Sequence, residues 1–286
     1  MNGIINLLKP PGMSSNGATV FLRKLLDEKR VGHAGTLDPG AAGVLVVLAG
    51  RSARLSEYLM NHSKRYVAEI CFGVRTDTLD SYGKVLERRS CSVCQERLEA
   101  ALPGFLGEIF QIPPAYSAVK IDGRPAYQLA RKGVEVQKEA RRVHIFGIQL
   151  LCQTGENRFL LEINCSKGTY IRTLLEDIAK SMGEIAHTSF LLRTASGSFE
   201  IDRAYTVDEI KEMAAREDFS FVQSPECALW ELGEVRLPER YAFALQNGQK
   251  IAGNADMEHF RLYCGEKFYG IGVCENGVLR LRIPLY

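Results

Sequence analysis

The sequence predicts an α+β fold, in which a mixed, largely antiparallel sheet is flanked by helices and followed by a small β-rich domain. Some segments alternate apolar and polar residues, and others repeat apolar residues at helical spacing. Strand segments follow one another in pairs instead of alternating with helices, which argues against a parallel sheet. From Trp230 onward only short strands and tight turns are expected. We therefore expect a large domain over residues 1–225 and a small one over residues 230–286.

The first expected elements are a strand over residues 4–8 and a helix that Ser14 or Ser15 can cap. A glycine-rich loop over residues 31–43 leads into an apolar strand over residues 44–48 and a helix over residues 52–60. The apolar face of the first helix consists of Ala18, Phe21, Leu22, Leu25 and Leu26.

Strict alternation over residues 65–72 predicts a half-buried strand, and residues 84–88 are expected to be its hairpin partner. Ser92 and Gln95 predict a capping box for a helix that ends near Leu102.

The second half of the large domain repeats these signals. An antiparallel pair is expected over residues 143–151 and 158–166, then a helix over residues 170–182 and a strand over residues 188–192. Thr206 and Glu209 predict a capping box for one more helix. In the small domain, Asn276-Gly277 predicts a hairpin turn.

The composition is that of a globular protein, with 46% hydrophobic and 24% charged residues, and it argues against disorder. The net charge is only +2, so a nucleic-acid partner would need basic side chains gathered on one face. No apolar run approaches the roughly 20 residues of a membrane-spanning helix, and the first residues lack a signal-peptide pattern. Most of the eight cysteines lie in apolar runs and are expected to be free thiols. We therefore expect a cytoplasmic protein without membrane contact.

The segment over residues 120–142 is more basic than the rest of the chain, with seven basic and three acidic residues. A turn at Asp122-Gly123 and a short helix between Pro125 and Gly133 are expected within it. A charge run of this kind is usually a solubilising loop, but its length and central position favour contact with RNA. The basic side chains expected to make this contact are Lys120, Arg124, Arg131, Lys132, Arg141 and Arg142.

Asp38 lies in a loop with glycines at positions 32, 35, 40 and 43 and is followed by Pro39. Such a loop can approach a ligand closely, because glycine tolerates conformations closed to other residues. The simpler interpretation is a turn in which Asp38 hydrogen-bonds its own backbone. The alternative is a reactive carboxylate, which needs a cationic partner. Arg172 is a candidate for that partner, although a solvated helix-surface charge is the commoner fate of such an arginine.

Four separated runs, together with Leu191-Leu192-Arg193-Thr194, resemble the bacterial tRNA pseudouridine-55 synthases, the TruB-type family. This resemblance covers about residues 4–200, with the runs in the expected order. It implies the pseudouridine synthase fold, a PUA-like C-terminal domain, and isomerisation of the T-loop uridine of tRNA. The four runs are residues 9–15 (KPPGMSS), 32–39 (GHAGTLDP), 64–66 (KRY) and 166–172 (SKGTYIR).

The resemblance also implies roles for individual residues. Asp38 occupies the place of the catalytic aspartate, and Arg172 that of the arginine that pairs with it. Tyr66 matches the tyrosine that stacks on the target uracil. The remaining positions, His33, Tyr170 and Leu191, fall where the family lines the pocket for the flipped nucleotide.

The sequence departs from the family at two of these runs. Ala34 replaces a frequent threonine, and Leu192 stands where a second arginine is usual, which weakens the expectation of backbone contacts there. The chemistry is consistent with the resemblance, because a stacked uracil must be extruded before an enzyme can act on it. An isomerisation needs no cofactor or metal, and the single Cys91-x-x-Cys94 pair has no second pair for structural zinc.

Two other functions remain open from the sequence. The basic segment and the small β-rich domain would also suit an RNA-binding or RNA-folding factor with an incidental pocket. A carboxylate-dependent nucleoside hydrolase is a third hypothesis, although no motif positions a second acid. Whether Asp38 attacks the sugar, attacks the base or abstracts a sugar proton is not decided by sequence. The expected partner is the T-stem-loop of tRNA, and a monomer is sufficient.

Overall fold

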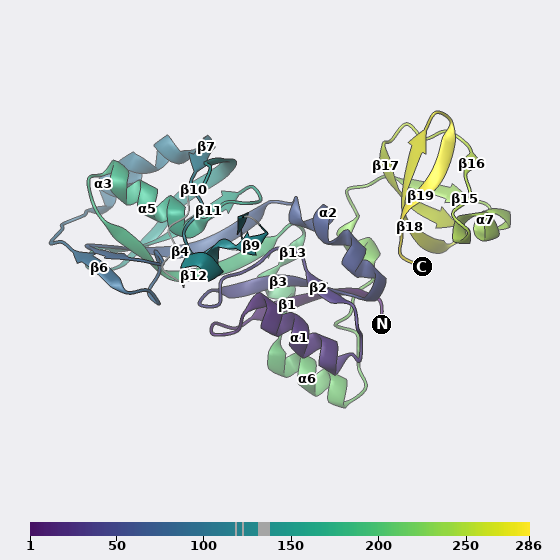
Figure 1. Cartoon of the computed structure of the whole chain (residues 1–286), viewed down its shortest axis with the longest axis horizontal. Helices are drawn as coiled ribbons and strands as arrows, with labels where there is room; N and C mark the ends of the chain where they lie inside the picture. Colours follow the sequence, from purple (N-terminus) through teal and green to yellow (C-terminus); the bar gives the residue numbers. More distant parts are fainter. Residues whose placement is uncertain (118, 122, 131–137) are drawn as a thin grey trace.

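The computed structural model of the chain describes residues 1–117, 119–121, 123–130 and 138–286. Figure 1 shows an elongated molecule, in which a large body carries the N-terminus and a smaller β-rich unit ends the chain. Within the described residues, the body is built on a ten-stranded sheet and the end unit on a five-stranded sheet. This architecture confirms the predicted α+β class.

The large sheet is mixed and mostly antiparallel, as expected. Its main path runs β14-β1-β3-β12-β4-β11-β10-β7, while β2 pairs with β3 and β13 pairs with β12. Only the β1–β14 and β3–β12 pairs among its described strands are parallel. Its strands are β1 (Gly3–Lys9), β2 (Val31–His33), β3 (Ala42–Ala49), β4 (Lys64–Phe72), β7 (Gly107–Gln111), β10 (Arg141–Gly155), β11 (Arg158–Cys165), β12 (Ala186–Ser196), β13 (Phe199–Glu200) and β14 (Tyr205–Thr206).

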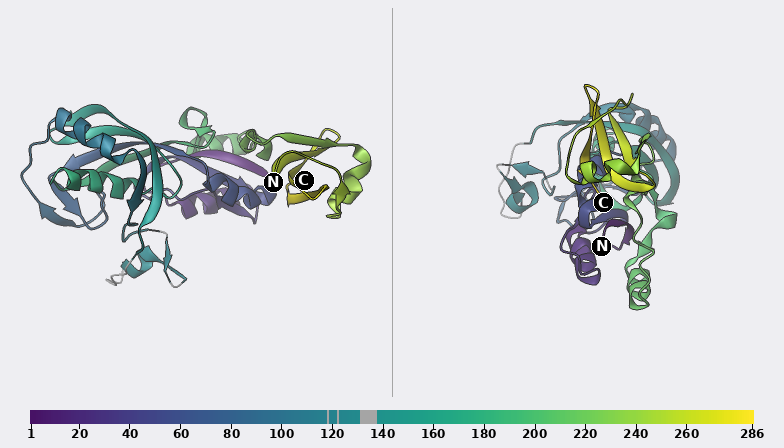
Figure 2. Two further views of the ribbon diagram at one scale, coloured as in Figure 1. Left: turned by 90° about the horizontal axis from the view of Figure 1, so that it is seen from above. Right: turned by 90° about the vertical axis from the view of Figure 1, so that its right-hand side faces the viewer.

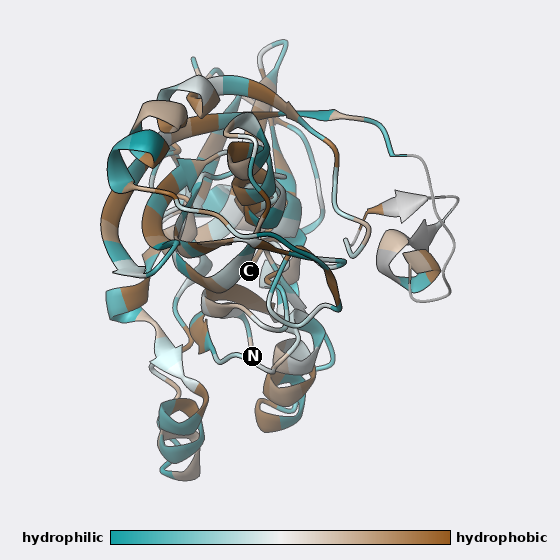
Figure 3. Cartoon of the chain, turned by 90° about the vertical axis from the view of Figure 1, so that its left-hand side faces the viewer, coloured by the Kyte–Doolittle hydropathy of each residue, from teal (hydrophilic) through white to brown (hydrophobic). Residues whose placement is uncertain are grey.

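Two groups of helices cover the large sheet. Helices α1 and α6 pack their apolar faces against β1 and β3, whereas α5 packs against β4, β11 and β12. Hydrophobic and hydrophilic residues alternate as coloured bands along the strands (Figure 3). No described helix has both the length and the apolar character needed to cross a membrane. The helices are α1 (Ser15–Leu25), α2 (Ser56–Met60), α3 (Gln95–Ala101), α4 (Ala126–Ala130), α5 (Ile171–Ser181), α6 (Val207–Ala215) and α7 (Ala242–Gln246).

Local capping explains where two of the helices begin. The Ser14 hydroxyl accepts a hydrogen bond from the Gly17 amide and caps α1. Thr206 and Glu209 form the predicted reciprocal capping box of α6. These two predictions are confirmed.

Four local predictions were wrong. Residues 230–286 were expected to contain only strands and turns, but they also form helix α7. Residues 31–33 form β2 instead of loop, because they pair with the end of β3. Residues 85–88 form β6 (Val85–Arg88), which pairs with β5 (Val74–Thr76), since β4 is already flanked by β11 and β12. Helix α3 begins after Cys94 without a side-chain cap, so Ser92 does not cap it.

The end unit consists of β15 (Glu234–Leu237), β16 (Ile251–Ala252), β17 (His259–Cys264), β18 (Lys267–Glu275) and β19 (Val278–Pro284) in the order β15-β17-β18-β19-β16. The predicted hairpin turn is present, with positive φ at Asn276 (52°) and Gly277 (74°). The unit shares one apolar cluster with the body, in which Leu285 and Ile271 join Ile4 and Val44. This cluster packs the end unit against the start of the large sheet.

Candidate active site

The loop that carries Asp38 connects β2 to β3 and is tied to the N-terminal segment. The Ser15 hydroxyl donates to the Leu37 carbonyl and accepts from the Leu37 amide, both at 2.9 Å. The Gly12 amide donates to the Pro39 carbonyl at 2.8 Å. The backbone on both sides of Asp38 is therefore held by residues outside the loop.

Lys9, the last residue of β1, is fully buried beneath this loop. Its Nζ donates to the carbonyls of Met13 (2.7 Å) and Ala41 (2.6 Å), and to two further carbonyls nearby. Burial lowers the pKa of Lys9 to about 8, although Asp38 acts in the opposite direction. The lysine connects the loop to the large sheet through backbone oxygens alone.

Arg193 on β12 is the largest of the fully buried side chains among the described residues. Its Nε donates to the Val44 carbonyl at 2.7 Å, and its two Nη atoms donate to the carbonyls of Thr36 and Gly35 at 3.3 Å. The backbones meet so closely that a Cβ at Gly43 would lie 2.2 Å from the Arg193 carbonyl oxygen. Arg193 thus attaches the Asp38 loop to strand β12.

Arg172, near the start of α5, contacts Asp38 directly. Its Nε lies 2.8 Å from Asp38 Oδ2, and its side chain is 5% exposed whereas that of Asp38 is 36% exposed. The guanidinium also donates to the carbonyls of Thr78 (2.8 Å) and Tyr116 (3.0 Å) and lies 3.8 Å from Asp80 Oδ2. A buried arginine therefore orients a carboxylate that is still open to a ligand.

Tyr66 on β4 and Leu191 on β12 lie beside the Asp38 loop. Tyr66 belongs to the apolar cluster that contains Leu37, and Leu191 packs against that cluster. Burial raises the pKa of the Tyr66 phenol, while Arg193 acts in the opposite direction. The site therefore has an apolar floor next to an anchored carboxylate.

Tyr170 directly precedes α5, without a side-chain capping bond, and is fixed through its backbone. Its amide donates to Gln111 Oε1 at 3.0 Å, and its carbonyl accepts from Gln111 Nε2 at 3.3 Å. Gln111 is 1% exposed at the end of β7, so β7 and the start of α5 are linked at this point. Burial raises the pKa of the Tyr170 phenol.

His33 is the last residue of β2 and precedes the Asp38 loop. Its Nδ1 is buried and has no hydrogen-bond partner among the described residues. Burial lowers the pKa of His33, and Arg193 acts in the same direction. The neutral form of the imidazole is therefore favoured.

The basic arm is only partly described. Strands β8 (Lys120–Ile121) and β9 (Arg124–Pro125) form a small hairpin that projects with α4 from the body (Figure 2). Arg141 and Arg142 are exposed at the start of β10, and Arg142 Nη1 lies 3.4 Å from a Glu108 carboxylate oxygen. Arg131 and Lys132 lie outside the described residues. For Lys120 and Arg124 the structure describes the backbone but not the side chains.

Among the described residues, no group of three or more His, Cys, Asp or Glu side chains could hold a metal ion. All eight cysteines, which lie within the described ranges, are free.

Four residues that build the site were not expected from the sequence: Lys9, Asp80, Gln111 and Arg193. The signal for Lys9 and Arg193 was a charge inside an otherwise apolar strand pattern, where burial requires bound acceptors.

Two family models match the chain. A family model described as TruB family pseudouridylate synthase (N terminal domain) matches residues 23–171, and one described as pseudouridine synthase II TruB, C-terminal, matches residues 233–282. A tRNA pseudouridine synthase B from Caldanaerobacter subterraneus subsp. tengcongensis is 42% identical over 286 residues, which cover 98% of each chain. Its counterpart from Streptococcus sanguinis is 39% identical over 277 residues, which cover 95% of each chain.

A solved structure, described as an H/ACA RNP bound to a substrate RNA containing 2'-deoxyuridine, has a chain with the same fold. It superposes with a TM-score of 0.73 at 22% identity, covering 99% of this chain and 85% of that one. At this identity the likeness concerns the fold alone.

Proposed function

The chain belongs to the TruB family of pseudouridylate synthases and isomerises uridine to pseudouridine in tRNA, and we propose that its target is the T-loop uridine at position 55. Asp38 is the proposed catalytic residue. The observation that carries this assignment is the 2.8 Å contact between Asp38 and a buried Arg172 beside the apolar floor of Tyr66 and Leu191.

In the proposed reaction the target base leaves its stack and enters the site. The bond from uracil N1 to the sugar breaks, the base rotates, and a bond from C5 to the same sugar carbon forms. The C5 hydrogen is released as a proton and N1 gains one, so atoms and electrons balance without an oxidant or reductant. Arg172 holds the Asp38 carboxylate in one orientation throughout, which is the positioning that the reaction requires.

The surrounding side chains suit a base that is detached during the reaction. Tyr66 offers an aromatic face for the uracil, and the Leu191 and Tyr170 side chains limit the access of water. His33 provides a neutral ring that can fill the gap left in the RNA stack. All of these residues come from one chain, so a monomer is sufficient.

RNA binding is proposed for two parts outside this site. The first is the basic arm over residues 120–142, where Lys120, Arg124, Arg131, Lys132, Arg141 and Arg142 would contact phosphates. The second is a PUA-like domain over residues 230–286, which follows a catalytic domain over residues 1–225. Free cysteines and a tRNA substrate suit activity in the cytoplasm, without a cofactor.

The proposal is tested by tritium release from tRNA labelled at uracil C5. Asp38→Asn should lower the rate by about a thousandfold or more, equivalent to roughly 4 kcal/mol of barrier, with tRNA affinity largely kept. Asp27→Asn, an exposed aspartate that follows α1, serves as the matched control and should leave the rate unchanged. Replacing the T-loop uridine by cytidine should abolish site-specific release. An active Asp38→Asn variant, or wild-type protein that only binds and folds tRNA, would overturn the proposal.

A further inference from the structure

An exposed aromatic ring lies next to the catalytic loop and has no part in the site described so far. Tyr82 is 73% exposed, in the connection between β5 and β6. Its ring lies against Gly40, two residues after Asp38, so closely that a Cβ at Gly40 would be 2.1 Å from the ring Cε2 atom. Burial of so little of the ring contributes little to stability, and the open surface is available to a ligand.

The loop that presents Tyr82 is ordered by its own hydrogen bonds. Asp80 Oδ1 accepts from the Thr78 hydroxyl (2.6 Å) and from the Tyr82 amide (3.0 Å). The Asp80 carbonyl accepts from the Thr76 hydroxyl at 2.7 Å. The backbone that carries the ring is therefore held before any ligand arrives, which reduces the entropy lost on binding.

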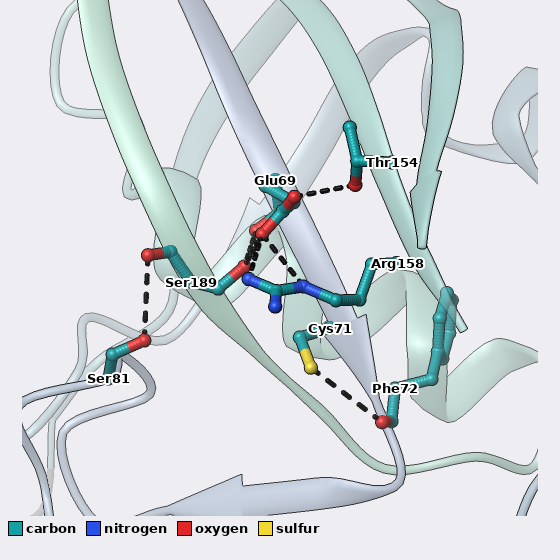
Figure 4. A network of polar contacts seen from close by, with 7 residues as sticks. All are labelled: Glu69, Cys71, Phe72, Ser81, Thr154, Arg158 and Ser189. Atoms are coloured by element: carbon teal, nitrogen blue, oxygen red, sulfur yellow. Dashed lines mark hydrogen bonds and ion pairs between the residues drawn. The ribbon is translucent and has the colours of Figure 1, made fainter. Parts of the chain in front are cut away.

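A polar network in the sheet anchors the same loop (Figure 4). The Ser81 hydroxyl donates to the Ser189 carbonyl at 3.5 Å, and the Ser189 hydroxyl donates to Glu69. Glu69 is held in turn by Arg158, whose Nη2 lies 2.6 Å from its carboxylate. Through Ser81, the residue next to Tyr82 is attached to the rigid strand β12.

The Tyr82 loop and the Asp38 loop are also held by one guanidinium. Arg172 Nε contacts Asp38 at 2.8 Å, while its Nη1 donates to the Thr78 carbonyl at 2.8 Å and lies 3.8 Å from Asp80. The two loops are thus attached to each other through one buried side chain.

We propose that Tyr82 is a stacking platform for an RNA base that neighbours the target uridine. Extrusion of the target leaves the adjacent bases without a stacking partner, and an exposed aromatic ring can supply one for any base. This inference rests on the proposed function and adds a substrate-positioning residue to it. Tyr82 would act on RNA binding and not on the bond rearrangement.

The first test is steady-state tritium release by Tyr82→Ala, Tyr82→Leu and Tyr82→Phe. Because alanine substitution of a stacking aromatic weakens binding by roughly five- to a hundredfold, Tyr82→Ala should raise KM about tenfold and change kcat little. Tyr82→Phe should restore the wild-type KM and Tyr82→Leu should not. Leu86→Ala is the matched control, since Leu86 is 58% exposed on the same hairpin. If leucine restores KM as well as phenylalanine does, the ring only fills space and the proposal is wrong.

A double-mutant cycle tests the contact itself. Gly40→Ala should push the ring aside and raise KM in the wild-type background. In the Tyr82→Ala background the same substitution should add no further increase, because the displaced ring is already absent. Additive effects would show that Gly40 acts independently of Tyr82 and would contradict the proposal.

Direct binding separates this inference from the proposed function. Fluorescence anisotropy gives Kd for a labelled unmodified tRNA with wild-type protein and with Tyr82→Ala, independently of turnover. Equal affinities would overturn the stacking role whether or not tritium is released. A tenfold loss of affinity would support the stacking role. Absence of tritium release by the wild type would overturn the proposed function alone.

Discussion

The burial of Arg193 leads to a prediction about the variant Arg193→Met. Methionine keeps an apolar stem of similar reach but donates no hydrogen bond. The carbonyls of Val44, Thr36 and Gly35 would each lose a donor. Since two of these carbonyls belong to the Asp38 loop, both stability and activity should fall.

The contacts set the size of the effect. Leaving the buried Val44 carbonyl unpaired costs about 1–3 kcal/mol, and the two partly buried carbonyls cost about 0.5–1.5 kcal/mol each. Relief of the desolvation of a buried cation offsets part of this sum. The net loss is about 3 kcal/mol, a large share of the roughly 5–15 kcal/mol that stabilises a typical protein. At about 2–4 °C per kcal/mol, the melting temperature should fall by about 6–12 °C.

Thermal unfolding followed by near-ultraviolet circular dichroism measures the first effect, and single-turnover tritium release measures the second. The rate should fall by about a hundredfold, because a small displacement of a catalytic group has effects of this order. Arg65→Met is the matched control, since Arg65 is on the neighbouring strand, is 47% exposed and lies 3.6 Å from Glu200. Its effect should stay within about 0.5 kcal/mol. Equal melting temperatures for the two variants would refute the reasoning.

Two further predictions concern the other cations of the site. Arg172→Lys keeps the charge but cannot hold Asp38 and the Thr78 carbonyl together, so the single-turnover rate should fall about a hundredfold. A near-normal rate would count against the positioning role. Burial lowers the pKa of Lys9 to about 8 in the folded protein, against 10.5 in the unfolded chain. Between pH 8 and pH 10.5 the unfolded chain therefore binds more protons than the folded one, and the stability of the wild type rises with pH. Lys9→Met lacks this gain, so wild-type stability relative to the variant should rise from pH 8 to pH 10 in thermal melts; a constant difference would contradict it.

The elements that depend on local signals could be predicted from the sequence. Ser14 caps α1, and the Thr206–Glu209 box opens α6, because capping acts within a few residues. The hairpin partner of residues 65–72 was wrong because strand pairing depends on the whole sheet. Both edges of β4 are taken by strands from the second half of the chain.

The residues of the site also fall into two groups, those expected from the sequence and those that only the fold reveals. Asp38 and Arg172 were expected together from the family resemblance, and the structure places them in contact. The roles of Lys9 and Arg193 were missed, because an isolated lysine or arginine is usually solvated. Only the complete fold shows that their partners are backbone carbonyls of a loop distant in sequence. The platform role proposed for Tyr82 likewise depends on its position against Gly40.

The bond from Arg193 to the Val44 carbonyl spans 149 positions of the chain. A ribosome adds about 5–20 residues each second, so roughly 7–30 s separate the synthesis of these two partners. During that interval Ala42 and Gly43 of β3 lack their pairing with β12, and the carbonyls of Val44, Thr36 and Gly35 lack their arginine donor. Newly made molecules therefore lack one of the anchors of the Asp38 loop until β12 has emerged.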